Sequence, residues 1–282
     1  MLRHDKTKSI FISIRARLLN FLNLLHYQLF IVNYQLRMFQ FKKFYVNQDR
    51  CAMKVGTDSV LLGAWCPIEN NPFSVLDIGA GTGILSLMLA QRSNAEHPSL
   101  QGELAQQIDA IEIDEDAYEQ CTENFESSPW SDRLFCFHAG LDEFIDEPED
   151  QYDIIISNPP FYSEDYKTGN EKRDLARFQE AMPFEDLIEA ADLLLSENGI
   201  FAVIIPFSEE EKFINLCAEV DLYPIKATRV KGTPTTEIKR SLLAFKRYEL
   251  SVLTADELII ETERHQYTED YIALTKDFYL KM

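Results

Sequence analysis

Residues 154–161, IIISNPPF, join an apolar run to four residues that could hold an aromatic amine. Such an amine is a poor nucleophile because its lone pair is delocalised into the ring, and two acceptors for its N–H hydrogens can draw the nitrogen toward a tetrahedral geometry. Asn158 offers a side-chain carbonyl, and Pro159 offers a backbone carbonyl constrained by its own ring and by that of Pro160. Phe161 offers a flat face for a stacked base. The segment therefore indicates activation by positioning and dipoles, or else only a rigid turn after a strand.

A glycine-rich turn follows a second apolar run within residues 73–91, FSVLDIGAGTGILSLMLAQ. The spacing of Gly79, Gly81 and Gly83 lets the backbone turn tightly and approach a ligand without an intervening side chain. Asp77 precedes the turn, and a carboxylate there would repel the phosphate that dinucleotide-binding turns hold. The pattern therefore favours a cationic or amine-bearing ligand without phosphates.

Glu112 lies in a third apolar run, IDAIEID at residues 108–114, at a place where a carboxylate can accept hydrogen bonds from both hydroxyls of a ribose. S-adenosylmethionine combines adenosine with a positively charged tail and has no phosphate. Its sulfonium methyl group would be the electrophile for an amine held by Asn158 and Pro159. The alternative is that Glu112 is a surface acid in an acid-rich stretch.

Strand-like and helix-like segments alternate along the chain and must position these residues. The strand-like runs contain SVLDI, IDAIEID, RLFCFHA, YDIIIS and IFAVIIP, followed by the hairpin-like YPIKATRVK and SLLAFKRYEL, and Gly199 is expected to stop the helix FEDLIEAADLLL. This order predicts an α/β fold with a doubly wound, seven-stranded, mostly parallel sheet and a C-terminal antiparallel hairpin. Ligands of such sheets bind beyond the carboxyl ends of the strands, where the glycine turn and Asn158 both lie.

The composition indicates a folded protein and limits which partners it can bind. The 282 residues are 46% hydrophobic, which is enough for a packed core, and they carry a formal net charge of −20. This charge argues against indiscriminate binding to nucleic acid, so DNA is not an expected partner. The five cysteines include no CxxC pair and are expected to be reduced thiols, and no metal site is expected.

The charges are distributed unevenly. Residues 96–153 contain eighteen acidic residues and one basic residue, whereas residues 226–247 contain seven basic residues and one acidic residue. A polyanion would be repelled by the first stretch and attracted by the second. The alternative is two solvated faces whose charges differ by chance.

The first 37 residues differ from the rest of the chain. They contain six basic residues and one acidic residue, and their apolar part is interrupted by polar side chains. Stable membrane insertion is therefore not expected, although a basic amphipathic helix on a membrane surface remains an alternative. We expect residues 1–37 to be a nonessential extension or the product of an early start, and residues 38–282 to form the catalytic domain.

Two of these motifs, VLDIGAGTG and SNPPF, resemble those of the class I S-adenosylmethionine-dependent methyltransferases that act on amino groups. The segments at residues 44–65, 158–162, 239–245 and 273–282 are similar to the bacterial tRNA(Val) adenine-N6 methyltransferases. This resemblance covers residues 38–282. It implies a cytoplasmic enzyme that methylates the adenine on the 3′ side of the anticodon with S-adenosylmethionine.

The resemblance also implies roles for individual residues. The cofactor's methionine side would be lined by Asp77 and the three glycines, and its ribose would be held by Glu112. Thr57 and Asp58 would close over the methionine end, unless they only cap a helix. Asn158 to Phe161 would hold the target base, with Asn158 also counted among the cofactor-binding residues. Either Leu141 or Asp142 would meet the cofactor adenine.

Binding of tRNA requires cations near the base pocket. Three segments are expected to converge there while residues 96–153 face away, and the chain is expected to be a monomer. The candidate RNA-binding residues are Lys42, Lys43, Arg50 and Lys54 in the first segment, Arg173 and Arg177 in the second, and Lys231, Lys239 and Arg240 in the closing hairpin.

Two other functions fit parts of the pattern. The same two acceptors could serve methylation of guanine N2 in ribosomal RNA or of a glutamine amide in a release factor, although enzymes of the last kind usually have Tyr after the prolines. A protein from a different class could bind the cofactor without catalysis and use residues 1–37 as a membrane anchor.

Overall fold

The computed structural model describes residues 38–68, 72–93, 107–146, 151–160, 182–249 and 254–282. The chain divides into two units, residues 1–39 and residues 40–282, and the features below belong to the second, apart from the first two residues of β1 (Met38–Gln40). Residues 1–37, Phe161, Arg173 and Arg177 lie outside the described residues. The expected domain boundary at residue 38 therefore stays a prediction.

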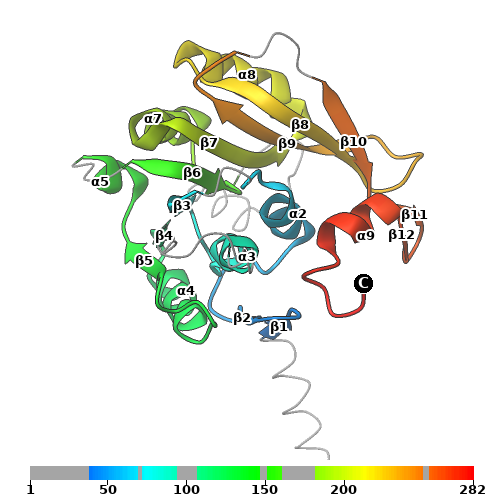
Figure 1. Cartoon of the computed structure of the whole chain (residues 1–282), viewed down its shortest axis with the longest axis horizontal. Coiled ribbons are helices and arrows are strands. Elements are labelled where there is room, and N and C mark those ends of the chain that lie inside the picture. The colour runs from blue at the N-terminus through cyan, green and yellow to red at the C-terminus, as the bar shows by residue number, and fades with distance from the viewer. Residues whose placement is uncertain (1–37, 69–71, 94–106, 147–150, 161–181, 250–253) are drawn as a thin grey trace, which may run out of the picture. The chain divides into compact units, whose positions relative to one another are not determined.

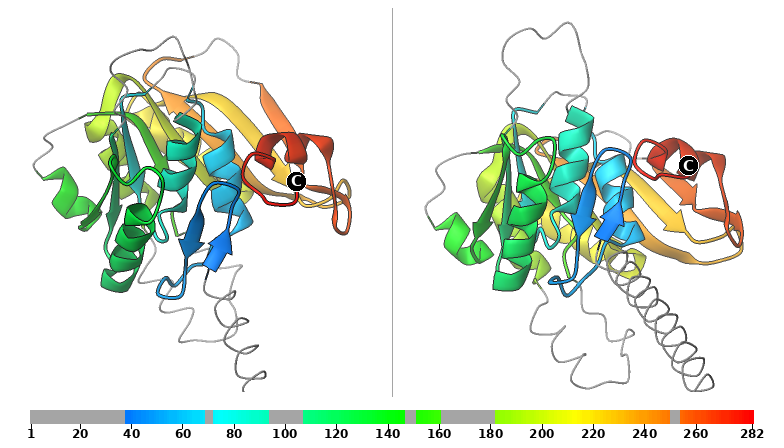
Figure 2. Two further views of the ribbon diagram at one scale, coloured as in Figure 1. Left: turned by 60° about the horizontal axis from the view of Figure 1, so that its bottom comes forward. Right: turned by 90° about the horizontal axis from the view of Figure 1, so that it is seen from below.

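A sheet of eight strands forms the centre of the second unit, in the order β10-β8-β9-β7-β6-β3-β4-β5. Figure 2 shows it running from the green strands to the yellow and orange ones. The strands are β3 (Ser74–Ile78), β4 (Gln107–Glu112), β5 (Leu134–His138), β6 (Tyr152–Ser157), β7 (Leu195–Pro206), β8 (Tyr223–Lys231), β9 (Ile238–Lys246) and β10 (Ala255–Ile259). The predicted fold class is confirmed: β3 to β7 are mutually parallel, and β9 runs antiparallel to β7 and to β8.

The eighth strand, β10, was not predicted. It pairs with β8 in parallel at the end of the sheet. Its sequence, ADELI, has exposed residues at its first three positions, so it lacks the apolar alternation by which strands are recognised. Charged side chains are common on edge strands because they discourage pairing with other chains.

Helices cover both faces of the sheet, as expected for a doubly wound fold. α7 (Phe184–Leu194) and α8 (Glu210–Glu219), with the short α5 (Leu141–Ile145), contribute to one buried cluster, and α2 (Thr57–Trp65) and α3 (Ile84–Ser93) lie on the other side (Figure 1). Alternate residues of each strand supply the two faces: Leu76 and Ile78 of β3 belong to this cluster, whereas Asp77 points to the opposite face and bonds to Ser86 of α3.

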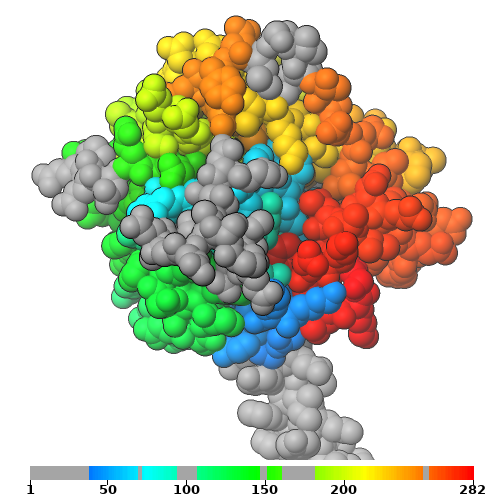
Figure 3. Space-filling view, viewed as in Figure 1, coloured from blue at the N-terminus to red at the C-terminus, as the bar shows by residue number. Residues whose placement is uncertain are grey.

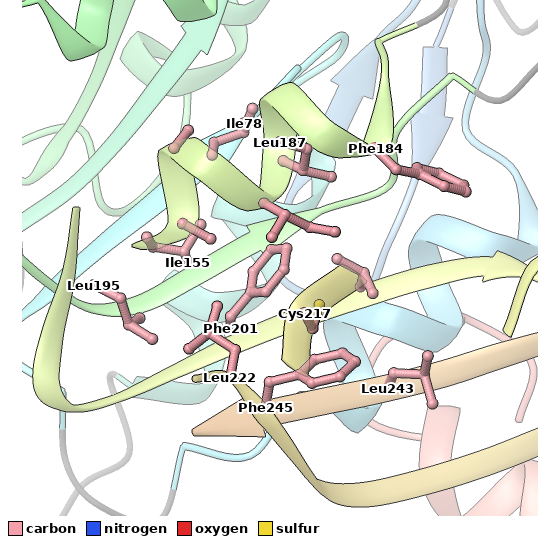
Figure 4. Close-up of a cluster of buried hydrophobic side chains, with 14 of the residues drawn as sticks. Ile78, Ile155, Phe184, Leu187, Leu195, Phe201, Cys217, Leu222, Leu243 and Phe245 are labelled. Carbon is pink, nitrogen blue, oxygen red and sulfur yellow. The ribbon is translucent and has the colours of Figure 1, made fainter. Parts of the chain in front are cut away.

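Aromatic rings from strands and helices fill this cluster. Phe201 of β7 and Phe245 of β9 occupy paired positions in the sheet, with ring centroids 6.0 Å apart. Figure 4 shows Cys217 of α8 near both rings and Leu187 of α7 on the far side of Phe201 in the same cluster. The core therefore fixes the parallel strands and the closing hairpin together.

Gly199 does not stop a helix, and the prediction for it is wrong. α7 ends at Leu194, and Gly199 lies inside β7, where the pairing with β6 shifts between Tyr152 and Ile154. A Cβ atom on Gly199 would lie 2.7 Å from Leu195 Cδ1 and 2.9 Å from the Tyr152 carbonyl oxygen. Glycine is needed here because the backbone passes close to its neighbours.

The remaining elements lie between, before or after the sheet strands along the chain. α4 (Glu115–Glu126) follows β4, η2 (Phe207–Glu209) follows β7, and α9 (Glu269–Thr275) lies near the C-terminus. The shortest strands are β1 (Met38–Gln40), β2 (Tyr45–Asn47), β11 (Glu261–Glu263) and β12 (Gln266–Tyr267). The chain end (red) lies beside the segment after residue 40 (blue) in Figure 3, where the Lys42 N–H donates to the Phe278 carbonyl. Within the part of the chain that the structure describes, no helix is long and apolar enough to cross a membrane.

Candidate active site

The glycine turn after β3 has the backbone conformation that its sequence predicts. Gly79, Gly81 and Gly83 have φ angles of 73°, 55° and 75°, in the left-handed region that favours glycine. A Cβ atom on Gly83 would lie 2.5 Å from Phe125 Cε1, so this glycine also allows α4 to pack closely. A Cβ on Gly81 would meet nothing within 4 Å. The turn is therefore packed against α4 at Gly83 and open at Gly81.

Glu112, at the end of β4, lies against this turn. Its Oε2 accepts a hydrogen bond from the Gly81 N–H at 2.7 Å, and its Oε1 accepts one from the Asp114 N–H at 3.0 Å. Both oxygens of the carboxylate are thus held by backbone donors. Because a carboxylate has about four lone-pair sites, it can still accept hydrogen bonds from ligand hydroxyls.

Asp77 is fully buried beneath the turn. Its Oδ2 accepts hydrogen bonds from the Ser86 N–H at 3.1 Å and the Ser86 hydroxyl at 2.7 Å, whereas its Oδ1 is buried without a partner among the described residues. Burial raises the pKa of Asp77 from 3.8 to about 7. A buried acid with an unsatisfied oxygen fits a ligand that brings positive charge, as S-adenosylmethionine would.

Ile113 is an apolar residue of this region that the sequence reasoning did not single out. It follows Glu112, is 72% exposed, and its Cδ1 lies 3.5 Å from the position of a Cβ on Gly140. α5 begins at Leu141 with Gly140 as its N-cap, so Leu141 and Asp142 both belong to the turn beside Ile113. An exposed apolar side chain next to the ribose-binding candidate suits the flat base of an adenosine.

Asn158 directly follows β6, and the end of that strand is tied to the end of β3. The Ser157 hydroxyl donates to the Ile78 carbonyl at 2.8 Å. The Asn158 Nδ2 donates to the Ser59 hydroxyl at 3.0 Å, which makes this amide nitrogen the group engaged with the protein. Pro159 is buried, and Asn158 and Pro160 are half-buried. The structure thus places the two predicted carbonyl acceptors at the carboxyl ends of the parallel strands, which is also the edge of the sheet where the glycine turn lies.

Thr57 and Asp58 form the first turn of α2. The N-cap is Gly56, and no side chain caps the helix, so the alternative that Thr57 or Asp58 is a cap is wrong. Asp58 Oδ2 instead forms an ion pair with Arg240 Nε at 2.8 Å. A cofactor candidate and an RNA candidate are therefore bonded to each other.

The closing hairpin reaches the same edge of the sheet. Pro206, the last residue of β7, pairs with Arg240, and Arg240 also pairs with Val230 of β8. The turn between β8 and β9 therefore lies at the edge where the parallel strands β6 and β7 end. Lys231 on this hairpin forms an ion pair with Glu257 at 2.7 Å, whereas Lys239 is exposed and has no ion pair within the described residues.

The lysines of the first basic segment differ in whether their ammonium groups bond to the protein. Lys42 Nζ donates to the carbonyls of Lys276 and Met282, at the chain end. Lys43 and Lys54 are exposed, and the described part of the chain offers neither an ion-pair partner.

Arg50 contradicts the expectation that the acidic stretch lies apart from the basic segments. It forms ion pairs with Glu119, at 2.9 Å, and with Glu123, and both of these acids belong to α4. The sequence could not reveal this contact because the partners are 69 or more positions away.

The chain matches known methyltransferases over most of its length. The family model described as "Methyltransferase small domain" matches residues 66–214. A predicted O-methyltransferase from Agrobacterium tumefaciens has a similar structure, with a TM-score of 0.59, 19% identity and coverage of 78% of this chain and 96% of that one. At this identity the likeness shows the fold alone.

Curated relatives are much closer in sequence. A tRNA1(Val) (adenine(37)-N6)-methyltransferase of Flavobacterium johnsoniae is 71% identical over 245 residues, which cover 87% of this chain and 100% of the relative. A protein of the same name from Pectobacterium carotovorum is 39% identical over 244 residues, covering 86% and 94% of the two chains. The glycine turn, Glu112 and Asn158 all follow or end strands at the carboxyl side of a class I methyltransferase sheet. These identities and coverages show that the chain belongs to the tRNA1(Val) (adenine(37)-N6)-methyltransferase family.

Proposed function

We propose that this protein transfers the methyl group of S-adenosylmethionine to N6 of adenine 37 in tRNA1(Val). The observation that carries the proposal is the placement of Asn158 and Pro159 at the same edge of the sheet as the glycine turn and Glu112. The family names the nucleotide, and the geometry supports a reaction between an adenosine-bearing cofactor and an amine held by two carbonyls.

The cofactor side of the site is built from β3 and β4. S-adenosylmethionine supplies an electrophilic methyl group on a positively charged sulfur. Asp77, once ionised, would hold positive charge on the methionine side, and Glu112 would accept hydrogen bonds from the ribose hydroxyls. The open backbone at Gly81 allows the ligand to approach without a side-chain clash.

The substrate side is built from the residues after β6. The Asn158 Oδ1 and the Pro159 carbonyl accept the two N–H hydrogens of the adenine amine, which turns its lone pair toward the methyl group. As the new N–C bond formed, the S–C bond of the sulfonium would break and leave the uncharged thioether S-adenosylhomocysteine. The methylated nitrogen, now acidic, would lose its proton to water, so no strong general base is needed. Phe161, as the sequence predicts, would provide the stacking face for the base.

The RNA side would be built from exposed cations, of which Lys239 lies on the hairpin at this edge. Lys239 on the hairpin, with Lys43 and Lys54, would contact phosphates, and Arg173 and Arg177 would join them. An ion pair stabilises the hairpin that carries Lys239: the Nη2 of Arg229 in β8 lies 2.7 Å from the Oε1 of Glu210 in α8. An adenine in an anticodon loop is already unpaired and enters the pocket at a modest unstacking cost. We further propose that the protein acts as a monomer in the cytoplasm, where its proposed tRNA substrate would be found.

The direct test is transfer of labelled methyl groups by the purified protein. Transcripts of tRNA1(Val) with adenine or guanine at position 37 are compared, and the product nucleoside is identified by mass spectrometry. N6-methyladenosine should form only in the adenine transcript. Methylation of ribosomal RNA or of protein, or transfer to none of these acceptors, would overturn the proposed function.

A further inference from the structure

We propose that Ser59 is a positioning residue that holds the Asn158 amide so that its carbonyl oxygen is available to the target amine. This inference rests on the proposed function and adds a residue to it. The Asn158 Nδ2 and the Ser59 hydroxyl oxygen are 3.0 Å apart, although the residues are 99 positions apart in the chain.

Asn158 needs such a partner because of the shape of its side chain. A half-turn of the terminal amide exchanges a carbonyl oxygen, which accepts, for an NH₂ group, which donates. Only the oxygen can receive a hydrogen from the adenine amine, and an NH₂ group in its place would oppose the donors of the base. In the orientation that the structure shows, the Ser59 hydroxyl accepts from the nitrogen, so one hydrogen bond satisfies the group that is not used in catalysis and leaves the oxygen for the base.

Ser59 is held in a fixed position by the helix that carries it. The residues of α2 from Val60 to Trp65 are buried. The Asp58–Arg240 ion pair ties the first turn of α2 to β9, and Trp65 Nε1 donates to the Thr228 hydroxyl of β8 at 2.9 Å at the other end. A side chain anchored in this way restricts the amide that it bonds, which is how residues behind a catalytic group limit its motion.

Ser59→Ala removes the hydrogen-bond partner and keeps a good helix former in α2. We expect kcat for tRNA methylation to fall by roughly tenfold, a loss typical of an outer partner of a functional side chain. The affinity for S-adenosylmethionine, the KM for tRNA and the melting temperature should stay unchanged. Ser59→Thr retains the hydroxyl and should restore most of kcat, whereas Ser59→Cys, a weaker partner of nearly the same size, should resemble the alanine variant. Thr122→Ala is the matched control because it removes a helix hydroxyl that bonds only the Tyr118 carbonyl among the described residues.

A double-mutant cycle separates positioning from a general structural role. If Ser59 acts through Asn158, then Ser59→Ala should have no further effect in an Asn158→Ala background, measured by single-turnover transfer of labelled methyl groups. Equal losses in both backgrounds, or no loss from Ser59→Ala alone, would overturn the role of Ser59 while leaving the proposed function intact. Absence of methylation by the wild-type protein would overturn both.

Discussion

Asp58 Oδ2 and Arg240 Nε form an ion pair at 2.8 Å that joins the first turn of α2 to the closing hairpin, across 182 positions of the chain. The two residues were expected to bind different molecules, a cofactor and an RNA. Their contact shows that a cation at this edge of the sheet can stabilise the fold and need not be free for RNA. Arg240 differs in this respect from its neighbour Lys239, which is exposed and has no ion pair within the described residues.

Charge reversal should therefore act differently at these two positions. Lys239→Glu should weaken tRNA binding and reduce its salt dependence by about one unit of slope, without changing the melting temperature or cofactor affinity. Arg240→Glu should also lower the melting temperature, because it replaces an attraction to Asp58 by a repulsion. Binding isotherms at several salt concentrations measure the first effect and thermal unfolding measures the second. Lys281→Glu makes the same charge change at an exposed residue outside the basic segments, and equal weakening by this control would show that only net charge matters.

Removal of the Asn158 side chain should affect catalysis more than binding. Asn158→Ala deletes one of the two acceptors for the adenine amine, and we expect turnover to fall by about a hundredfold or more. The fold and the affinity for S-adenosylmethionine should largely survive, as shown by circular dichroism and calorimetry. Asn198→Ala removes an exposed asparagine near the beginning of β7 and serves as the control. Near wild-type methylation by Asn158→Ala would rule out activation by this amide.

The buried Asp77 should make stability and cofactor binding depend on pH in opposite ways. Its pKa is raised from 3.8 to about 7, so the folded protein keeps a proton that the unfolded chain loses. The stability that this proton provides is present below pH 3.8 and is lost as the pH rises to about 7. Cofactor affinity should instead fall by up to about tenfold per pH unit below 7, because the cation needs the ionised acid.

Asp77→Asn tests both effects because it removes the titration and nearly preserves the shape. The unfolding free energy of this variant, measured by urea denaturation from pH 5 to 8, should lack the decline of the wild type. Its affinity for S-adenosylmethionine should be weaker and should no longer change with pH over this range. Wild-type pH dependence in the variant would mean that another group is responsible.

Glu112 should contribute to both the ligand and the glycine turn. Glu112→Ala removes the acceptor for the Gly81 and Asp114 N–H groups as well as the ribose contact, so it should weaken S-adenosylmethionine binding more than Glu112→Gln, which retains one acceptor oxygen. Calorimetry measures both, with Glu126→Gln on the exposed side of α4 as a control. Neither variant nor the wild type should bind NAD, and tight NAD binding by the wild type would show that the glycine turn has a different ligand.

Residues 38–282 should form an active protein without the basic extension. We expect this truncated chain to be folded, monomeric in sedimentation, and as active as the full chain, because the family resemblance begins at residue 38. Aggregation or loss of activity after the truncation would place the first 37 residues within the working enzyme.

The strands and turns could be predicted from the sequence where local chemistry determines them. The apolar runs of β3, β4, β6 and β7, and the left-handed glycines after β3, are consequences of neighbouring residues. β10 escaped prediction because an edge strand with a polar surface has no apolar periodicity.

The contacts between distant side chains could not be predicted in the same way. Ser59 meets Asn158, and Asp58 meets Arg240, only because α2 packs against the sheet near the end of β6 and the beginning of β9. No local pattern marks such a serine or such an ion pair. The same reason explains the ion pairs of Lys231 and Arg50. The sequence predicts that both are free to bind RNA, whereas in the structure each is paired with a carboxylate.

The hydrogen bond from the Gly81 N–H to Glu112 also has a consequence for competition among adenosine-containing metabolites. In turns that bind nucleotides, backbone N–H groups of this kind donate hydrogen bonds to phosphate oxygens. Here the protein supplies the anion itself, so ATP or ADP would have to displace a carboxylate and then lie beside its charge. We therefore expect ATP and ADP to compete poorly with S-adenosylmethionine for this site.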